Sequence, residues 1–336
     1  MAKVFVTGVA GFLGSHLADA LIKEGHSVVG IDNFLGGYKE NVPAEVDFHE
    51  IDARNFVKLR PLMKGVEVVF HCAAAPHEGL SVFSPNLITE HTYNTTVAVV
   101  SAAVAEGVKR VVFTSSMARY GEQETLPFTE DMIPKPKDPY GIAKYAAELV
   151  TESLCKAHGL EFVHITPHNI IGPRQKYDDP FRNVASIMIN LMLQGRQPII
   201  YGDGEQKRGF SFIWDVVDPM LKSGFLPDIS GEVINVGPDD EFTTINDLCQ
   251  RIGRIMDFKP LNPIYHGDRP MEVKLATCSA DKARRLLGYK TTYSLDQGLT
   301  ELYEWIKSKG AKPFTYHLDL EIITHTTPKT WKDRLF

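Results

Sequence analysis

The chain is poor in the features that mark several classes of protein. Its four cysteines are far apart and form no Cys-x-x-Cys pair, so neither a disulfide framework nor a metal site is indicated. No apolar run reaches the roughly 18 residues of a membrane span, and no signal-peptide pattern precedes the first strand-like segment. The net charge is −6, without a basic block, which argues against nucleic acid as a partner. We therefore expect a cytoplasmic protein that binds neither membrane nor nucleic acid.

A glycine-rich turn stands almost at the start of the chain. Residues 3–7 form a short apolar run, and three spaced glycines join it to a helix with leucines at helical spacing. The first glycine permits a tight turn, the second a close approach to a pyrophosphate, and the third contact between helix and sheet. The start of the helix then faces the phosphates. This pattern predicts a dinucleotide site formed by Gly8, Gly11, Phe12, Leu13 and Gly14.

Asp32 follows a second strand-like run at residues 27–31 and lies 18 residues after Gly14. This is close to the interval of about 20 expected for the acid that binds the adenosine ribose. A carboxylate there repels a 2′-phosphate, so NAD is favoured over NADP. The alternative is that Asp32 only caps the end of the strand.

Strand-like runs and helical patterns alternate along the first half of the chain. Further strands are expected at 46–51, 67–72, 109–115 and 161–166, and helices at 55–63, 86–106 and 140–157. This alternation predicts an α/β fold with a Rossmann-type, doubly wound parallel sheet.

The character of the sequence changes after residue 172, where a loop rich in glycine, proline, arginine and aspartate begins. An apolar run near 231–237 is expected to rejoin the first sheet, and helices are expected at 183–194, 244–256, 280–287 and 295–308. We therefore predict an NAD-binding domain at 1–172 and a smaller, interleaved C-terminal substrate domain at 173–230 and 238–311. Residues 312–336 form an irregular, packed or partner-binding extension.

Tyr140 and Lys144 stand at positions i and i+4 of a predicted helix, so they share one face. A nearby cation at about 4 Å can lower the pKa of a tyrosine enough for it to act as a base. Ser116 lies at the carboxyl end of a predicted strand, where such sheets place ligands, and could share the proton transfer. Ser115 is the alternative, and either serine could instead cap the next turn.

Taken together, these motifs resemble the extended short-chain dehydrogenase/reductase family, in particular its nucleotide-sugar epimerases and dehydratases. The resemblance covers about residues 2–308. It rests on Thr7 to Gly14, Asp32 to Phe34, His71 to Ala74, Ser115 and Ser116 before Tyr120 and Gly121, Tyr140 to Lys144, Asn169 to Arg174, Tyr201 to Gly204, Arg208, and Arg269 with Pro270.

The resemblance implies a role for each matching position. Tyr140 is the expected base, Lys144 holds the nicotinamide ribose, and Ser116 assists at the sugar hydroxyl. The other implied NAD contacts are Asp32 and Asn33, Asp52 and Ala53 beside the adenine, Ala73 and Ala74 along the pyrophosphate and ribose, and His168 at the nicotinamide. The implied substrate contacts are Asn169, Arg208 and Arg269 at the diphosphate, Tyr201 near the base, and Glu272 at the nucleotide ribose. Two phosphates in an acidic protein need arginine forks, although either arginine alone could be an ordinary surface ion pair.

Departures from the family pattern bear on the reaction. Members that dehydrate or decarboxylate usually carry an acid one or two positions after the catalytic Ser or Thr, whereas Met117 and Ala118 stand here. This favours an NAD-dependent 4-epimerase acting on a UDP-hexose or UDP-hexuronate through a 4-keto intermediate. Arg119 or Arg174 could hold a uronate carboxylate.

Three alternatives within the enzymes stay open: a dehydratase, a decarboxylase and a 4-keto reductase. A dinucleotide-sensing scaffold without turnover is a fourth possibility, which the presence of both Tyr140 and Lys144 disfavours. Apolar residues on more than one side of the helices near 86–106 and 140–157 predict a homodimer contact. His164 and His168 are four apart on a predicted strand, a poor arrangement for one metal ion.

Overall fold

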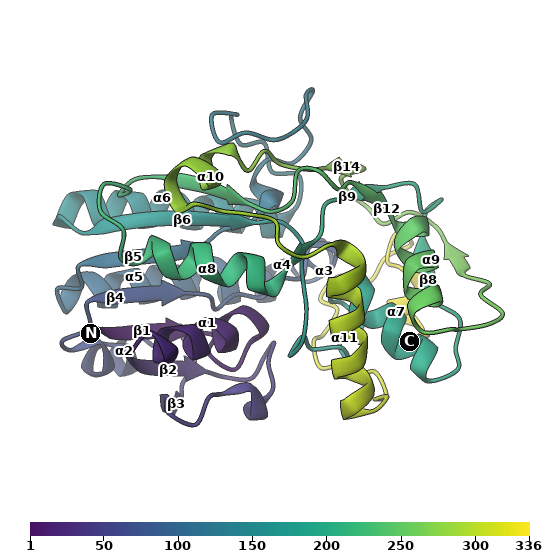
Figure 1. Ribbon diagram of the computed structural model, residues 1–336, viewed down its shortest axis with the longest axis horizontal. Helices are drawn as coiled ribbons and strands as arrows, with labels where there is room; N and C mark the ends of the chain where they lie inside the picture. The colour runs from purple at the N-terminus through teal and green to yellow at the C-terminus, as the bar shows by residue number, and fades with distance from the viewer.

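The computed structural model describes residues 1–336 and contains a central sheet of seven parallel strands (Figure 1). The strand order is β11-β6-β5-β4-β1-β2-β3. These strands are β1 (Lys3–Thr7), β2 (Ser27–Asp32), β3 (Asp47–Glu50), β4 (Val68–His71), β5 (Arg110–Thr114), β6 (Glu161–Pro167) and β11 (Val233–Val236). β4 and β5 are buried along their whole length, as expected of strands covered on both faces. The predicted doubly wound fold is confirmed.

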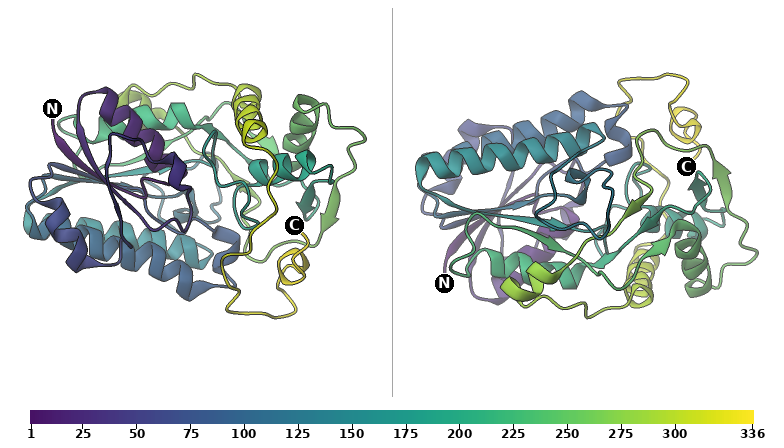
Figure 2. Two further views of the ribbon diagram at one scale, coloured as in Figure 1. Left: turned by 90° about the horizontal axis from the view of Figure 1, so that it is seen from below. Right: turned by 90° about the horizontal axis from the view of Figure 1, so that it is seen from above.

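Helices cover both faces of this sheet (Figure 2). One layer consists of α1 (Phe12–Lys23), α8 (Ile213–Ser223) and α10 (Asp281–Leu287), which share a core with the strands through Leu17, Val216 and Ala283. The other layer consists of α2 (Phe56–Met63), α5 (Thr95–Ala105) and α6 (Pro139–His158), which pack through Leu59, Val99 and Cys155. The expected helix at 86–106 is present as three joined segments: α4 (Pro85–Thr89), the π-helical turn η2 (Glu90–Asn94) and α5.

A second core forms around α7 (Val184–Leu193), α9 (Ile245–Ile255) and α11 (Leu295–Lys309). Short strands complete this part of the molecule: β7 (Ile170–Ile171) with β10 (Ser211–Phe212), β8 (Ile199–Tyr201) with β13 (Ile264–His266), and β9 (Lys207–Arg208) between β12 (Thr243–Thr244) and β14 (Leu275–Ala276). The remaining short elements are η1 (Lys39–Asn41), α3 (Glu78–Ser81), η3 (Met117–Arg119) and α12 (Lys329–Lys332). None of the helices is both long enough and apolar enough to cross a bilayer.

The strands of the large sheet all end at the same edge, facing the second core. Because the strands are parallel, the segments that follow β1, β2, β4, β5 and β6 meet there. The last residues of the chain return to this edge and pack against α3 and α4 (Figure 2). A cleft between the two cores is thus lined from both sides.

Candidate functional site

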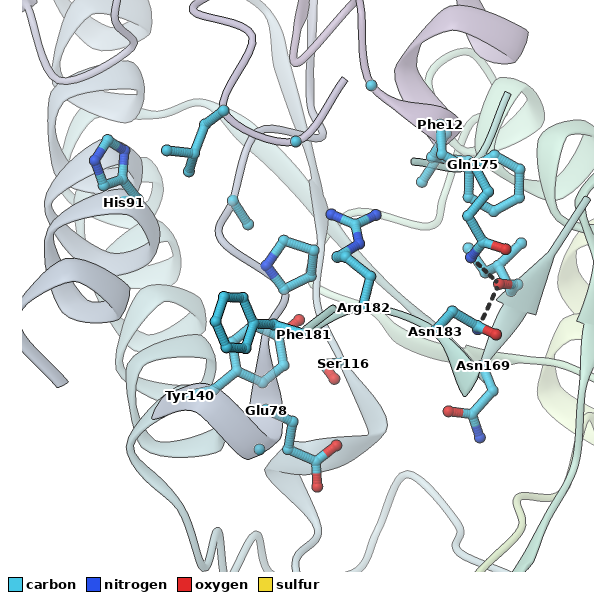
Figure 3. Close-up of a pocket in the computed structure, with 18 of the residues that line it drawn as sticks. Phe12, Glu78, His91, Ser116, Tyr140, Asn169, Gln175, Phe181, Arg182 and Asn183 are labelled. Carbon is cyan, nitrogen blue, oxygen red and sulfur yellow. Dashed lines mark hydrogen bonds between the residues drawn. The ribbon is translucent and has the colours of Figure 1, made fainter. Parts of the chain in front are cut away.

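A pocket with about 2400 Å³ of empty space, part of it open to solvent, lies at the carboxyl edge of the sheet. The close-up in Figure 3 shows Ser116 and Tyr140 inside it, with Arg182 to one side and Glu78 to the other. The pocket brings together nearly all the residues singled out from the sequence: Gly8, Gly11, Phe12, Leu13, Gly14, Asp32, Asn33, Asp52, Ala53, Ala73, Ala74, Ser116, Tyr140, Lys144, Asn169, Tyr201, Arg208, Arg269 and Glu272.

The glycine-rich turn leaves room for a ligand because side chains there would collide with the backbone. Gly8 has φ +73°, and a Cβ on it would stand 2.9 Å from the amide nitrogen of Ala73. A Cβ on Gly14 would overlap the carbonyl oxygen of Gly8. The close approach of α1 to the turn therefore requires glycine, and the first amides of α1 face the pocket as a phosphate cradle does. These residues fit a dinucleotide.

Two carboxylates line the adenosine side of the pocket. Asp32 ends β2 and accepts hydrogen bonds from the amides of Ala10 at 2.9 Å and Phe34 at 2.7 Å. It therefore caps the local turns and lines the pocket at the same time, so the two roles considered for it coexist. Asp52 is held by Arg54 at 2.9 Å and accepts from Asn33 at 3.2 Å. Burial opposes ionisation of Asp52, but the bonds to Arg54 prevail and lower its pKa to about 2.

The expected catalytic residues meet at the start of α6. Lys144 donates to the carbonyl of Thr114 at 2.7 Å, and its Nζ lies 5.9 Å from the centre of the Tyr140 ring. Burial lowers the pKa of Lys144 to about 8. Burial also raises the pKa of Tyr140, against a hydrogen bond with Ser116 that lowers it. The protein's own groups thus keep Tyr140 protonated, and its activation as a base needs a further positive charge besides that of Lys144.

Ser115 and Arg119 belong to a buried network beneath the pocket. The Ser115 hydroxyl donates to Glu148, and Glu148 pairs with Arg119 at 3.0 Å. Arg119 also donates to the hydroxyl of Tyr120 at 3.1 Å. Arg119 does not line the pocket and is 5% exposed, so the idea that it holds a uronate is wrong. Ser116, whose hydroxyl accepts from the amide of Ala118 at 3.2 Å and faces Tyr140, is the serine left for a substrate.

Opposite Tyr140, two arginines converge on one carboxylate. Arg269 pairs with Glu272 at 2.8 Å, and Arg208 lies 3.6 Å from the same Glu272 oxygen. Arg208 also donates to the carbonyls of Lys207 and Lys274, which hold its guanidinium in place. Arg269 lies over the ring of Tyr201, 5.0 Å from its centre. Two positive forks beside an aromatic ring suit a nucleoside diphosphate.

Two of the expected site residues lie elsewhere. His168 follows β6, and its Nε2 bonds the carbonyl of Ala276 at 2.9 Å, whereas the preceding Pro167 lines the pocket. Successive residues in extended chain face opposite sides, so Pro167 faces the pocket while His168 points away from it. Arg174 pairs with Asp19 of α1 at 2.6 Å and does not line the pocket. It fastens the loop after β7 to the first domain.

Several pocket residues were not singled out from the sequence. Glu78 is the first residue of the short helix α3, Arg182 comes from a loop without a repeating pattern, and Trp331 comes from the C-terminal extension. Trp331 packs on Phe181 at a ring separation of 5.3 Å. Glu78 lies in the segment from Pro76 to Ser81, whose sequence is unusual for the family that the chain resembles, and this departure is the signal that points to it.

Comparison with known proteins agrees with this geometry. A chain named UDP-glucose 4-epimerase from Mycolicibacterium smegmatis is 33% identical over 320 residues, covering 92% of this chain and 99% of that protein. A UDP-N-acetyl-alpha-D-glucosaminuronate decarboxylase from Bacillus cytotoxicus is 30% identical, with 91% and 98% covered. A crystal structure of UDP-glucuronic acid 4-epimerase from Bacillus cereus, with UDP-glucuronic acid and NAD, matches with TM-score 0.85 and 30% identity over 91% of this chain and 99% of that one. The model of the NAD dependent epimerase/dehydratase family matches residues 4–237, and the chain belongs to that family.

Proposed function

We propose that the protein is an NAD-dependent nucleotide-sugar 4-epimerase that inverts C4 of a UDP-linked hexose or hexuronate through a 4-keto intermediate. One observation carries this proposal: Tyr140 and Ser116 share a single pocket with the glycine cradle on one side and the Arg208, Arg269 and Glu272 cluster on the other. The related crystal structure that holds NAD and UDP-glucuronic acid supports it.

The chain's residues divide the work between the two ends of the pocket. When bound, NAD would accept and return the hydride, and its positive nicotinamide ring would favour the deprotonated form of Tyr140. Tyr140 takes the proton of the C4 hydroxyl and returns it, and Ser116 orients that hydroxyl. Lys144, charged below a pKa of about 8, holds the nicotinamide ribose and offsets negative charge on Tyr140. Arg208 and Arg269 hold the diphosphate.

A dehydratase is the second candidate, and Glu78 is the observation that favours it. Met117 and Ala118 carry no proton that can be transferred. Glu78, however, places a carboxyl in the same pocket, and burial raises its pKa to about 7. A carboxyl of this kind can act as a general acid near neutral pH.

We also propose a division of labour along the chain and an assembly. Residues 1–172, with the strand near 231–237, bind NAD, and residues 173–230 and 238–311 bind the nucleotide sugar. The half-exposed apolar residues Ile142 and Leu149 on α6 form part of a homodimer contact. A cytoplasmic location is consistent with four free thiols.

Proton NMR in deuterated buffer tests the function, with UDP-glucose, UDP-galactose, UDP-glucuronate and UDP-N-acetylglucosamine in separate tubes and NAD present. We expect one substrate to yield its C4 epimer with no deuterium in the ring, because the hydride returns to the sugar it left. Deuterium at C5 together with loss of water would replace the epimerase with the dehydratase. Loss of a carboxylate would indicate a decarboxylase, and conversion only with reduced cofactor would indicate a reductase.

A further inference from the structure

The pocket contains five acidic side chains, and only one of them has no partner in the protein. Asp32 accepts from two backbone amides and Asp52 from Arg54. Asp138 accepts from the amide of Gly141 at 2.9 Å, and Glu272 pairs with Arg269. Glu78 forms neither an ion pair nor a side-chain hydrogen bond; its side chain is open to the interior of the pocket, whose walls enclose it.

The backbone that carries Glu78 is firmly held. The neighbouring His77 donates through Nε2 to Asp179 at 2.9 Å, and both side chains are fully buried. Ser81, at the end of α3, bonds Asp138 at 3.3 Å. Trp331 packs beside Gly79, where an added Cβ would stand 3.3 Å from its ring. An unpartnered carboxylate on a rigid segment is typical of a group reserved for a ligand.

Glu78 lies between the two halves of the proposed active site. Figure 3 shows the Glu78 carboxyl near Tyr140 and Ser116, and Nη1 of Arg269 lies 3.2 Å from where a Cβ of the adjacent Gly79 would stand. Tyr140 takes the C4 proton in the proposed reaction, and Arg208 and Arg269 hold the diphosphate. The hexose ring has to span the interval between them, so Glu78 faces the ring.

We propose that Glu78 is a specificity-determining residue that accepts hydrogen bonds from hexose hydroxyls and disfavours a hexuronate. This inference rests on the proposed function and narrows its substrate class to UDP-linked sugars without a carboxylate. An ionised carboxylate only accepts hydrogen bonds, so it pairs well with hydroxyls and repels a second carboxylate.

Two of the three arginines near the pocket that are not assigned to the diphosphate lie outside it. Arg119 is engaged by Glu148 and Arg174 by Asp19, both outside the pocket. Arg182 does line the pocket, but its Nη1 lies 3.1 Å from where a Cβ of Gly36 would stand, on the loop that follows Asp32. Figure 3 shows Arg182 and Glu78 on opposite sides of Ser116, and the charge of Arg182 acts on Tyr140.

Calorimetric titration of the full-length, NAD-loaded protein with UDP-glucose and with UDP-glucuronate tests the inference. We expect the wild type to favour UDP-glucose, and Glu78→Gln to reduce the ratio of the two affinities on the order of 100-fold. Glu78→Val, which removes both charge and hydrogen bonding, should weaken UDP-glucose further. Glu124→Gln, on an exposed loop, is the matched control and should leave the ratio unchanged.

The two assays separate the role of Glu78 in sugar selection from the proposed C4 inversion. A wild type that favours UDP-glucuronate, or a ratio that Glu78→Gln does not move, overturns the role of Glu78 while C4 inversion in the NMR assay can still occur. If inversion is absent for every sugar but the affinity ratio responds to Glu78→Gln, the proposed reaction fails and the specificity role stands. A ratio that shifts instead with Arg182→Ala would assign the discrimination to Arg182 and overturn the inference.

Discussion

At the scale of single residues, Tyr140 is the group on which the proposed reaction depends. We expect Tyr140→Phe to lower kcat by about 10³-fold, because the phenol is the only group placed to exchange the C4 proton and general-base contributions are typically 10²–10⁴-fold. Its ring, which packs with Ala118 and Ile88, stays in place. The bound NAD, measured by chromatography after denaturation, should therefore be unchanged. Activity near the wild-type level would exclude Tyr140 as the base.

The buried ammonium of Lys144 lowers the stability of the folded protein, although the proposed reaction needs it. Burial lowers its pKa from 10.5 to about 8, so at pH 7 the folded protein holds a charge that costs on the order of 3 kcal/mol. Lys144→Met removes this cost but leaves the Thr114 carbonyl without its donor, which costs about 1–3 kcal/mol. We expect an inactive variant with a Tm a few degrees higher at pH 7.

The sign of this effect follows from proton linkage. Between pH 8 and 10.5 the unfolded chain binds more protons at Lys144 than the folded one, so wild-type stability gains with rising pH. The advantage of Lys144→Met should shrink when melting is repeated at pH 9.5. The exposed Lys309→Met is the control. If Lys144→Met raised the Tm by the same amount at pH 7 and pH 9.5, the assignment of a destabilising buried ammonium to Lys144 would be wrong.

Glu78 should make sugar selection depend on pH. Burial raises its pKa to about 7, so the carboxyl is protonated below that value and charged above it. We expect the affinity for UDP-glucuronate to fall between pH 6 and 8, because repulsion appears as Glu78 ionises. Affinity for UDP-glucose should not fall. The charged and titratable groups that face it are Asp138, which caps the start of α6, Tyr140 of α6, Arg208 of β9, and Arg269 and Glu272 before β14. A flat UDP-glucuronate profile would contradict this assignment.

Residues with a regular geometric role could be assigned to the site from the sequence, and others could not. The glycines, Asp32 and Tyr140 occupy positions that the parallel sheet itself defines, at strand ends and on the first helical turn after them. Glu78 and Arg182 are placed by loop paths that depend on distant contacts, such as the His77 to Asp179 bond. No local pattern encodes such paths.

At the scale of elements, most helices and strands begin and end within one or two residues of the expected positions. α8 was not expected, because Pro219 lies inside it and proline argues against a helix interior. Its Val216 and Met220 are fully buried against the sheet, and this burial outweighs the lost backbone bond. Tertiary packing therefore stabilises α8, although its local sequence disfavours a helix.

The C-terminal extension, residues 312–336, is the element whose role the structure clarifies most. Glu321 accepts from the amides of Asn86 and Leu87 at the start of α4, at 3.0 and 2.8 Å. Farther on, Thr330 bonds the hydroxyl of Tyr201, and Trp331 lines the pocket. The extension therefore joins both domains beside the substrate region.

We expect Trp331→Ala to raise KM for the nucleotide sugar about tenfold, because the cavity it leaves loosens the wall around Tyr201 and Gly79. The amount of bound NAD should stay the same, because the extension does not touch the glycine cradle. Ile323→Ala, at a side chain that is 58% exposed, is the control. Loss of NAD together with the sugar would mean that the extension supports the whole fold instead of the sugar site.

At the scale of the whole molecule, the layer formed by α5 and α6 has an outer face with no covering element (Figure 2). Ile142 and Leu149 of α6 are 53% and 49% exposed there. Apolar side chains clustered on one helix layer are typical of an interface with a second copy, and the pairing of two such layers would form a four-helix contact.

An arginine in this contact should separate the protomers. Leu149→Arg would bury an unpaired charge at the interface, which costs about 3–5 kcal/mol and raises the dissociation constant at least 100-fold. Light scattering coupled to gel filtration should then give the mass of one chain where the wild type gives two. Ile264→Arg, on the short strand β13 far from α6, should remain dimeric. Because the pocket is built within one protomer, the Leu149→Arg monomer should still bind NAD, and a wild type that elutes as a monomer would remove the contact altogether.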